Sequence, residues 1–149
     1  MPGRRLGYAT RFGLYGIAGL CLEFLFTSVT SQLDRTGDAR LIGWSSLWML
    51  PIWGCAFLTC DVMGRRFAKR AVSWPARAAF YVLFCFALEY VSGAAIRACV
   101  GRAPWDYSAA RWNLHGLIRL DYAPIWAVCG LGGERLASWL RRVQIMRDE

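Results

Sequence analysis

Two acidic residues interrupt long apolar segments of this sequence. Glu23 lies in Gly-Leu-Cys-Leu-Glu-Phe-Leu-Phe, and Glu89 lies in Phe-Cys-Phe-Ala-Leu-Glu-Tyr-Val. A carboxylate inside a bilayer is costly, so it normally has a partner, carries a proton or takes part in chemistry. If the two carboxylates approach each other, repulsion and desolvation favour the neutral form, and we expect at least one to be protonated. Such a pair is typical of a proton or cation site, or of a general acid and base.

The same glutamates also have a purely structural interpretation. A protonated glutamate can form a hydrogen bond to a neighbouring helix and so hold a helical bundle together. We favour the functional interpretation, because ionisable groups inside membranes are functional by default. Glu23 and Glu89 are therefore candidate residues for binding a substrate or an ion.

The glutamates belong to a chain with four long apolar stretches. The chain has 149 residues, 56% of them hydrophobic, and a mean hydropathy of +0.30. A helix needs about 20 residues to cross the hydrocarbon layer. Stretches of about this length lie at 12–32, 45–63, 78–98 and 117–140. Arg and Lys lie between the stretches and not along one face of each, which argues against a soluble bundle. The sequence predicts an all-α, polytopic membrane protein with one membrane domain over residues 1–149.

The basic residues predict an orientation in the membrane. Most of the 18 Arg and Lys residues lie before the first stretch, between the second and third, and after the fourth. The positive-inside rule then places both termini in the cytoplasm, with a cytoplasmic tail at 141–149. In a bacterium the membrane would be the cell inner membrane. The first stretch is expected to be a retained helix, because its apolar run is too long for a signal peptide and no Ala-x-Ala site follows.

Composition also bounds the cofactors and partners. The six cysteines and single histidine show no Cys-x-x-Cys or Cys/His spacing typical of zinc, so we expect no metal ion and no cofactor. No soluble surface of interleaved basic and aromatic residues is present, so no nucleic-acid partner is expected. The net charge of +8 favours contact with anionic membrane lipids.

Matched residues at constant spacings predict an internal repeat. An offset of 66 residues takes Glu23 to Glu89, and their neighbours Leu22 and Leu88 match as well. An offset of 73 relates further pairs in the second and fourth stretches. We expect a tandem repeat of two-helix units, at about 12–63 and 78–140, in which both copies have the same orientation. The pairs separated by 73 residues are Pro51 with Pro124, Trp53 with Trp126, and Asp61 with Glu134.

Asp61 and Glu134 lie near the predicted cytoplasmic ends of their helices. Asp61 and Arg65 have the i, i+4 spacing of a surface ion pair, which is the simplest interpretation of that aspartate. Glu134 is kept as a further candidate site residue because it matches an acidic residue in the first unit.

The predicted outer loop between the third and fourth stretches is rich in polar and aromatic residues. Trp105 and Tyr107 suit a membrane interface, while Asp106 and Asn113 can cap turns through short side-chain hydrogen bonds. A structural loop explains most of this pattern. In the functional alternative the loop is a lid above the glutamates, and all four residues are candidates for binding.

Two arginines near this loop extend the functional alternative. Arg97 and Arg111 would be available to an anionic head group. Arg97 has two other possible positions: it can pair with Glu89, which lies on a similar helical face, or extend outward to the membrane interface.

The loop also carries a resemblance to a known family. Pro-Trp-Asp-Tyr-Ser at 104–108, followed by Asn-Leu-x-Gly-x-Ile-x-Leu at 113–120, resembles the putative ABC-transporter type IV family, which includes the transmembrane protein 229 group. Gly19 with Glu23, Leu88 with Glu89, and the late Glu134 also fit. The resemblance covers nearly the whole chain and implies a transporter-like membrane protein.

Three functions are compatible with the sequence. The first is a transporter-like or transporter-accessory subunit. The chain lacks a Gly-x-x-x-x-Gly-Lys-Ser/Thr phosphate loop and is therefore not itself an ATPase. Four helices enclose little space, so a transport path would need a homo-oligomer or a partner membrane subunit. The second is a membrane enzyme acting on a lipid or isoprenoid, with the glutamates as acid and base. The third is a scaffold subunit of a membrane complex.

Overall fold

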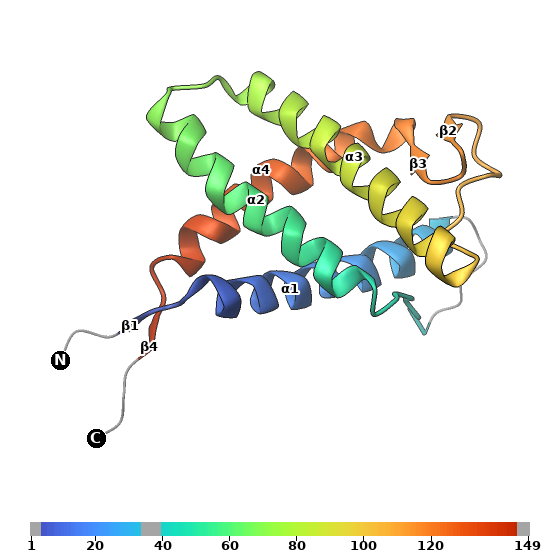
Figure 1. Ribbon diagram of the computed structural model, residues 1–149, viewed down its shortest axis with the longest axis horizontal. Coiled ribbons are helices and arrows are strands. Elements are labelled where there is room, and N and C mark those ends of the chain that lie inside the picture. The colour runs from blue at the N-terminus through green and yellow to red at the C-terminus, as the bar shows by residue number, and fades with distance from the viewer. Residues whose placement is uncertain (1–3, 34–39, 146–149) are drawn as a thin grey trace.

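The computed structural model describes residues 4–33 and 40–145, and four α-helices account for most of them (Figure 1). The prediction of a mostly helical protein is confirmed. Two short antiparallel strand pairs and one 3-10 turn, η1 (Leu120–Tyr122), complete the described elements. The helices are α1 (Tyr8–Leu33), α2 (Met49–Lys69), α3 (Trp74–Val100) and α4 (Ala123–Leu140). The strand pairs are β1 (Arg4–Arg5) with β4 (Gln144–Ile145), and β2 (Asn113–Leu114) with β3 (Ile118–Arg119).

Two parts of the predicted organisation lie outside the described residues. These are residues 34–39 of the first outer loop and residues 146–149 of the predicted cytoplasmic tail.

The fourth apolar stretch was predicted to be helical from residue 117, and this boundary is wrong. His115 and Gly116 have positive φ angles of 54° and 68°, so the chain turns sharply before the stretch begins. Leu117 and Ile118 are then buried beside α3 in an extended segment, because hydropathy reports burial and not backbone conformation. The helix begins only at Ala123, with Pro124 in its first turn, where the missing proline N–H costs nothing.

The second stretch also differs from its predicted bounds of 45–63. Residues 45–48 precede the helix, α2 begins at Met49, and it continues through basic residues to Lys69. The first and third stretches form α1 and α3, which are each a few residues longer than predicted.

Two helices, α1 and α3, are long and apolar enough to cross a membrane. They contain 26 and 27 residues, or about 40 Å each at a rise of about 1.5 Å per residue. Only 22% of the apolar window of each helix is buried inside the protein. Exposed side chains such as Leu25 and Leu83 therefore need an apolar environment outside the chain. This supports association with a membrane, where lipid would cover these faces.

Helix packing forms two pairs with a shared centre. α1 packs mainly on α2 and α3 packs on α4, while α2 contacts α4 between the pairs. Glycines allow the close approach: a Cβ on Gly19 would lie 2.1 Å from Cγ of Trp53, and one on Gly130 would lie 2.3 Å from Cβ of Tyr81. The buried core therefore lies along the α1–α2 and α2–α4 contacts.

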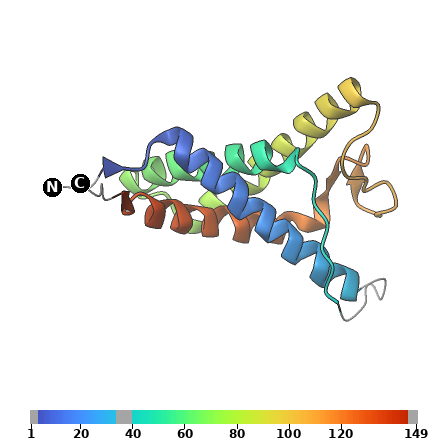
Figure 2. The same cartoon turned by 90° about the horizontal axis from the view of Figure 1, so that it is seen from below.

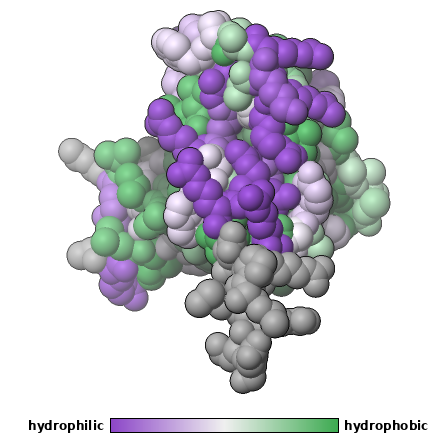
Figure 3. Space-filling view, turned by 90° about the vertical axis from the view of Figure 1, so that its left-hand side faces the viewer, coloured by the Kyte–Doolittle hydropathy of each residue, from purple (hydrophilic) through white to green (hydrophobic). Residues whose placement is uncertain are grey.

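The two ends of the bundle differ in character. The chain termini lie together at one end, where β1 pairs with β4, and the β2–β3 loop lies at the other (Figure 2). Toward the loop end, α1 and α3 diverge from each other (Figure 2). The terminal end is strongly hydrophilic in the space-filling view (Figure 3). A surface hollow there is lined by Arg5, Arg65, Ser138, Arg141 and Arg142.

Candidate functional site

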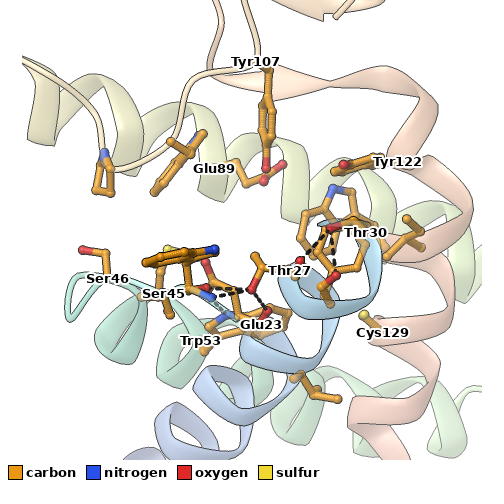
Figure 4. A pocket seen from close by; sticks show the side chains of 18 residues that line it. Glu23, Thr27, Thr30, Ser45, Ser46, Trp53, Glu89, Tyr107, Tyr122 and Cys129 are labelled. Atoms are coloured by element: carbon orange, nitrogen blue, oxygen red, sulfur yellow. Dashed lines mark hydrogen bonds between the residues drawn. The ribbon is translucent and has the colours of Figure 1, made fainter. Parts of the chain in front are cut away.

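A cavity of about 510 Å³ lies on the loop side of the bundle (Figure 4). Its lining includes both glutamates, Glu23 from α1 and Glu89 from α3. The structure thus brings two carboxylates that are far apart in the sequence to one enclosed space. The volume lies within the range of small-molecule sites, about 300–1,000 Å³.

Most of the cavity wall is aromatic. Four indoles and three other rings line it, and they come from every part of the bundle. Among the described residues that line the cavity there is no Arg, Lys or His. The only formal charges that the lining can supply are therefore negative. The aromatic lining consists of Phe26, Trp44, Trp53, Trp105, Tyr107, Tyr122 and Trp126.

Glu23 is held by the indole of Trp53. The Nε1–H of Trp53 donates a hydrogen bond of 3.2 Å to Oε2 of Glu23. The indole reaches this position because it lies directly over Gly19, one turn before the glutamate on α1. Its ring also packs against Phe57 and Trp126, with centroids 5.2 and 6.0 Å away. A rigid aromatic cluster thus fixes one carboxylate at the wall.

Glu89 is more deeply enclosed and less well satisfied. Only 7% of the residue is exposed, yet its Oε2 has no hydrogen-bond partner among the described residues. Tyr107 points at this carboxylate from the loop above (Figure 4). The Nε1–H of Trp126, which lines the same cavity, is likewise buried without a partner in the described part of the chain. Unpaired buried polar groups are rare in folded proteins, and such groups often mark the place where an ion, a ligand or a water molecule binds.

Hydrogen bonds attach the segment at 40–48 to α1. The hydroxyl of Thr27 donates to the backbone carbonyl of Trp44 over 2.9 Å, and it accepts from the Trp44 backbone N–H over 2.8 Å. The hydroxyl of Ser28 donates to the carbonyl of Leu41 over 2.8 Å. These bonds hold Trp44 at the cavity wall opposite the β2–β3 loop.

The loop residues predicted as candidates divide into two groups. Trp105 and Tyr107 line the cavity, whereas Asp106 and Asn113 do not. The Nε1–H of Trp105 donates to the carbonyl of Leu117 over 2.9 Å, and its ring lies against Gly93 of α3. Burial raises the pKa of Tyr107, so its hydroxyl keeps its proton and can donate.

Asp106 and Asn113 have the turn-capping role expected of their residue types. Oδ1 of Asp106 accepts from the hydroxyl and the backbone N–H of Ser108, at 2.6 and 2.9 Å. These two bonds hold the pKa of Asp106 below its usual range. Oδ1 of Asn113 accepts from the N–H of Gly116 over 2.9 Å, which stabilises the left-handed turn. Both residues act on the cavity by shaping the loop that closes it.

The arginines near the loop take other partners than those considered from the sequence. Nη1 of Arg97 donates to the backbone carbonyl of His115 over 3.1 Å, and no Arg97–Glu89 ion pair occurs within the described residues. Arg111 lies over the ring of Trp112 at 5.3 Å. Neither arginine lines the cavity.

A second polar cluster fills the interior near the terminal end. Asp61 is completely buried and forms ion pairs with Arg11 and Arg141, while the hydroxyl of Tyr15 donates to it over 3.1 Å. Arg65 lies 3.8 Å away and is the most exposed of these partners. The interpretation of Asp61 and Arg65 as a surface pair is therefore wrong, because distant parts of the chain surround the aspartate.

Glu134 forms a similar cluster between α3 and α4. It forms an ion pair with Arg77, whose Nε donates to Oε1 over 3.0 Å. The hydroxyl of Tyr81 donates to the same oxygen over 2.7 Å. Glu134 does not line the cavity.

Sequence reasoning missed the arginines and tyrosines of these two clusters. A signal was present, because the offset of 66 residues that relates the glutamates also takes Arg11 to Arg77 and Tyr15 to Tyr81.

Comparison with protein families matches residues 10–143 to the model described as "Putative ABC-transporter type IV". The chain belongs to this family. The resemblance drawn from the Trp-Asp-Tyr-Ser loop is thereby confirmed over nearly the whole chain. No solved structure matches the chain.

In this member of the putative ABC-transporter type IV family, the glycine-rich run of α4 has a packing role. Gly130 lies against the ring of Tyr81, and Gly133 lies against Phe57 and Cys60. A side chain at either position would collide with those neighbours. The glycines thus bring α4 close to α2 and α3, and the run has no lysine with which to bind a phosphate.

Proposed function

We propose that this protein is a transporter-like or transporter-accessory membrane subunit, in which Glu23 and Glu89 form one proton or cation site. The observation that carries the proposal is that two carboxylates from different helices line one cavity that no basic side chain among the described residues enters. Two acids in a shared, poorly hydrated space do not ionise independently, so charge at one favours a proton or a cation at the other. The membership of a transporter-type family agrees with this role.

The proposal includes a tandem repeat of two-helix units. Matched contacts support it: Arg11 and Tyr15 of α1 bind Asp61 of α2, and the residues related to them by the same offsets, Arg77 and Tyr81, bind Glu134. The cavity shows the same relation, because Trp53 lines it beside Glu23 and Trp126, at the offset of 73, lines it with Glu89. A duplicated unit explains why the contacts and the sequence share their spacing.

The proposal also includes four membrane spans with both termini in the cytoplasm. The termini lie together, as an even number of crossings requires (Figure 2). The arginine-lined hollow lies at that end, in agreement with the positive-inside rule. α2 and α4 are less apolar than α1 and α3, and they bury their charged residues, Asp61 and Glu134, in ion pairs between helices.

The arrangement of one chain also suggests why a partner is needed. The cavity lies on the loop side, and the two ion-pair clusters fill the interior toward the terminal end. A continuous path would therefore use a second copy of the chain or a partner membrane subunit. Membrane lipids would cover the exposed apolar faces of α1 and α3.

Proton movement into liposomes tests the proposal. The protein would be reconstituted around an entrapped pH-sensitive dye, and a pH step applied outside. We expect flux with the natural protein, loss of flux with Glu23→Gln or Glu89→Gln, and normal flux with Asp121→Asn, which removes an acid outside the cavity. Size-exclusion profiles would establish that the variants are folded. Equal flux in all variants, or natural protein that behaves like empty liposomes, would contradict the proposal.

An enzyme acting on a lipid or isoprenoid is the second candidate. The aromatic lining of the cavity favours it, because a long apolar substrate could pack beside the two acids. The glutamates would then serve as general acid and base. An accumulated precursor in the lipids of a deletion strain would support this function, and an unchanged lipid profile would count against it. A scaffold role would instead require a stoichiometric partner after purification in a gentle detergent.

A further inference from the structure

We propose that the ligand of the Glu23–Glu89 cavity is an organic cation with an apolar body, such as a quaternary ammonium or phosphonium amphiphile. This inference rests on the proposed function, because it specifies what the same paired-carboxylate site binds.

Charge is the first argument. The chain carries 18 Arg and Lys residues and a net charge of +8. Its aromatic cavity nevertheless contains two carboxylates and, in the part of the chain that the structure describes, no basic lining residue. An anionic ligand would meet repulsion from both acids and attraction from none of the lining. A cation would neutralise a buried charge whose exposure to water is small, so the interaction would be weakly screened.

The walls are the second argument. Trp44, Trp53, Trp105 and Trp126 come from four separate segments and surround the same space. The faces of indole rings attract cations, and cages of aromatic rings are a common means of binding quaternary ammonium groups. The same rings offer apolar surface to the hydrocarbon part of such a ligand. A neutral lipid would use the walls but would not need the acids.

Size and ligand chemistry distinguish an organic from an inorganic cation. A volume of about 510 Å³ far exceeds the space that a bare metal ion occupies. Metal ions such as Ca²⁺ and Mg²⁺ are surrounded by six or more oxygen atoms at short range. Here the carboxylates stand among rings, and the hydroxyls of Thr27 and Thr30 already bond to backbone carbonyls. The cavity therefore suits a large and weakly hydrated cation.

The two acids have different parts in this site. Glu23 already accepts a hydrogen bond from Trp53. Oε2 of Glu89 is buried without a partner among the described residues, although its side chain lines the cavity. Glu89 is thus the main counter-ion, and Glu23 contributes from the opposite wall. Tyr107, which points at Glu89 in Figure 4, closes the site from the loop.

Two probes of equal shape and opposite charge test the proposal. Tetraphenylphosphonium and tetraphenylborate would be titrated into the full-length protein in detergent micelles, with tryptophan fluorescence as the readout and protein-free micelles as the blank. We expect saturable quenching by the phosphonium and none by the borate. Equal binding of both probes, or no saturable binding of the phosphonium, would overturn the proposal. This comparison uses the natural protein and so does not depend on how variants fold.

Variants then locate the site. Glu89→Gln is expected to weaken phosphonium binding by about tenfold or more, which is about 1.4 kcal/mol, and Glu23→Gln by less. Trp44→Leu, which removes a wall, is expected to weaken binding as well. Trp139→Leu is the matched control, because Trp139 is exposed on α4 and does not line the cavity. Equal affinity in the Glu89→Gln and natural proteins would place the ligand elsewhere and overturn the proposal.

The flux and binding experiments can fail separately. Selective phosphonium binding with normal proton flux in the glutamine variants would retain the cation site and remove the proton-coupled function. Loss of flux in those variants without selectivity between the probes would retain the function and reject the organic cation.

Discussion

The indole N–H of Trp53 donates a 3.2 Å hydrogen bond to the carboxylate of Glu23, and this bond joins α2 to α1 at the cavity wall. The equivalent indole of the second half, Trp126, has no hydrogen-bond partner among the described residues. The two halves of the cavity are thus built from the same residue types but are satisfied differently. That difference makes Glu89, and not Glu23, the carboxylate open to a ligand.

Replacing each indole by phenylalanine separates the hydrogen bond from the packing. Trp53→Phe removes the bond to Glu23 and retains an aromatic ring beside Phe57. We expect it to lower the free energy of unfolding by about 1 kcal/mol more than Trp126→Phe, which removes an N–H that has no partner in the described part of the chain. Thermal unfolding in micelles measures the difference. A larger loss in Trp126→Phe would show that the hydrogen bond at Glu23 is not the stronger contact.

Asp61 is the acidic residue whose loss should destabilise the bundle most. Asp61→Asn leaves the buried Arg11 and its neighbour Arg141 without their shared carboxylate. Breaking a buried ion pair in this way costs about 3–5 kcal/mol. Glu134→Gln is the matched comparison and is expected to cost less, because its partner Arg77 is partly exposed to solvent. Equal unfolding free energies for both variants would contradict the buried position of Asp61.

The contact between Gly19 and Trp53 predicts a strong effect of one methyl group. A Cβ at Gly19 would overlap the indole, whereas a Cβ at Gly13 would meet nothing within 4 Å. Gly19→Ala is expected to cost about 1–3 kcal/mol through overpacking. Gly13→Ala should be neutral or slightly stabilising, since alanine favours the helix over glycine. Unfolding temperatures of the two variants in the same detergent provide the measurement, and similar values would argue against close packing of α1 on α2.

The loop that closes the cavity should stay intact to unusually low pH. Because the pKa of Asp106 is lowered by Ser108, its bonds to that residue form once the carboxyl ionises and are lost only as pH falls through the lowered value. Ser108→Ala removes the hydroxyl donor, so the titration midpoint should move up toward the usual range of an aspartate. The ¹³C carboxyl resonance of Asp106 reports the midpoint, and an unchanged midpoint would contradict the role of Ser108. Asp121, whose pKa is lowered by Arg119, serves as an internal control and should not move.

Sequence patterns located the elements better than their contacts. Apolar length indicated α1 and α3 well because their outward faces are apolar along their whole length. The same criterion extended the fourth helix too far, since Leu117 and Ile118 are buried in an extended turn that His115 and Gly116 create. Hydropathy cannot distinguish these two ways of burying an apolar residue.

The candidate site shows a similar division. The offset between Glu23 and Glu89 indicated equivalent positions, and both do line one cavity. Local spacing was misleading for Asp61, because its strongest partners, Arg11 and Arg141, lie 50 and 80 residues away in the sequence. The roles of Asp106 and Asn113 in turns followed from their residue types, but which loop residues face the cavity depends on the turn itself.

The central claim is that Glu23 and Glu89 act as one site, and a comparison of single and double variants in liposomes tests it most directly. Proton flux would be measured for Glu23→Gln, for Glu89→Gln and for the protein with both changes, against Asp121→Asn as control. Groups that act as a unit are not additive, so the account predicts that each single variant loses as much flux as the double variant. Partial losses that add up in the double variant would show two independent carboxylates and contradict the account.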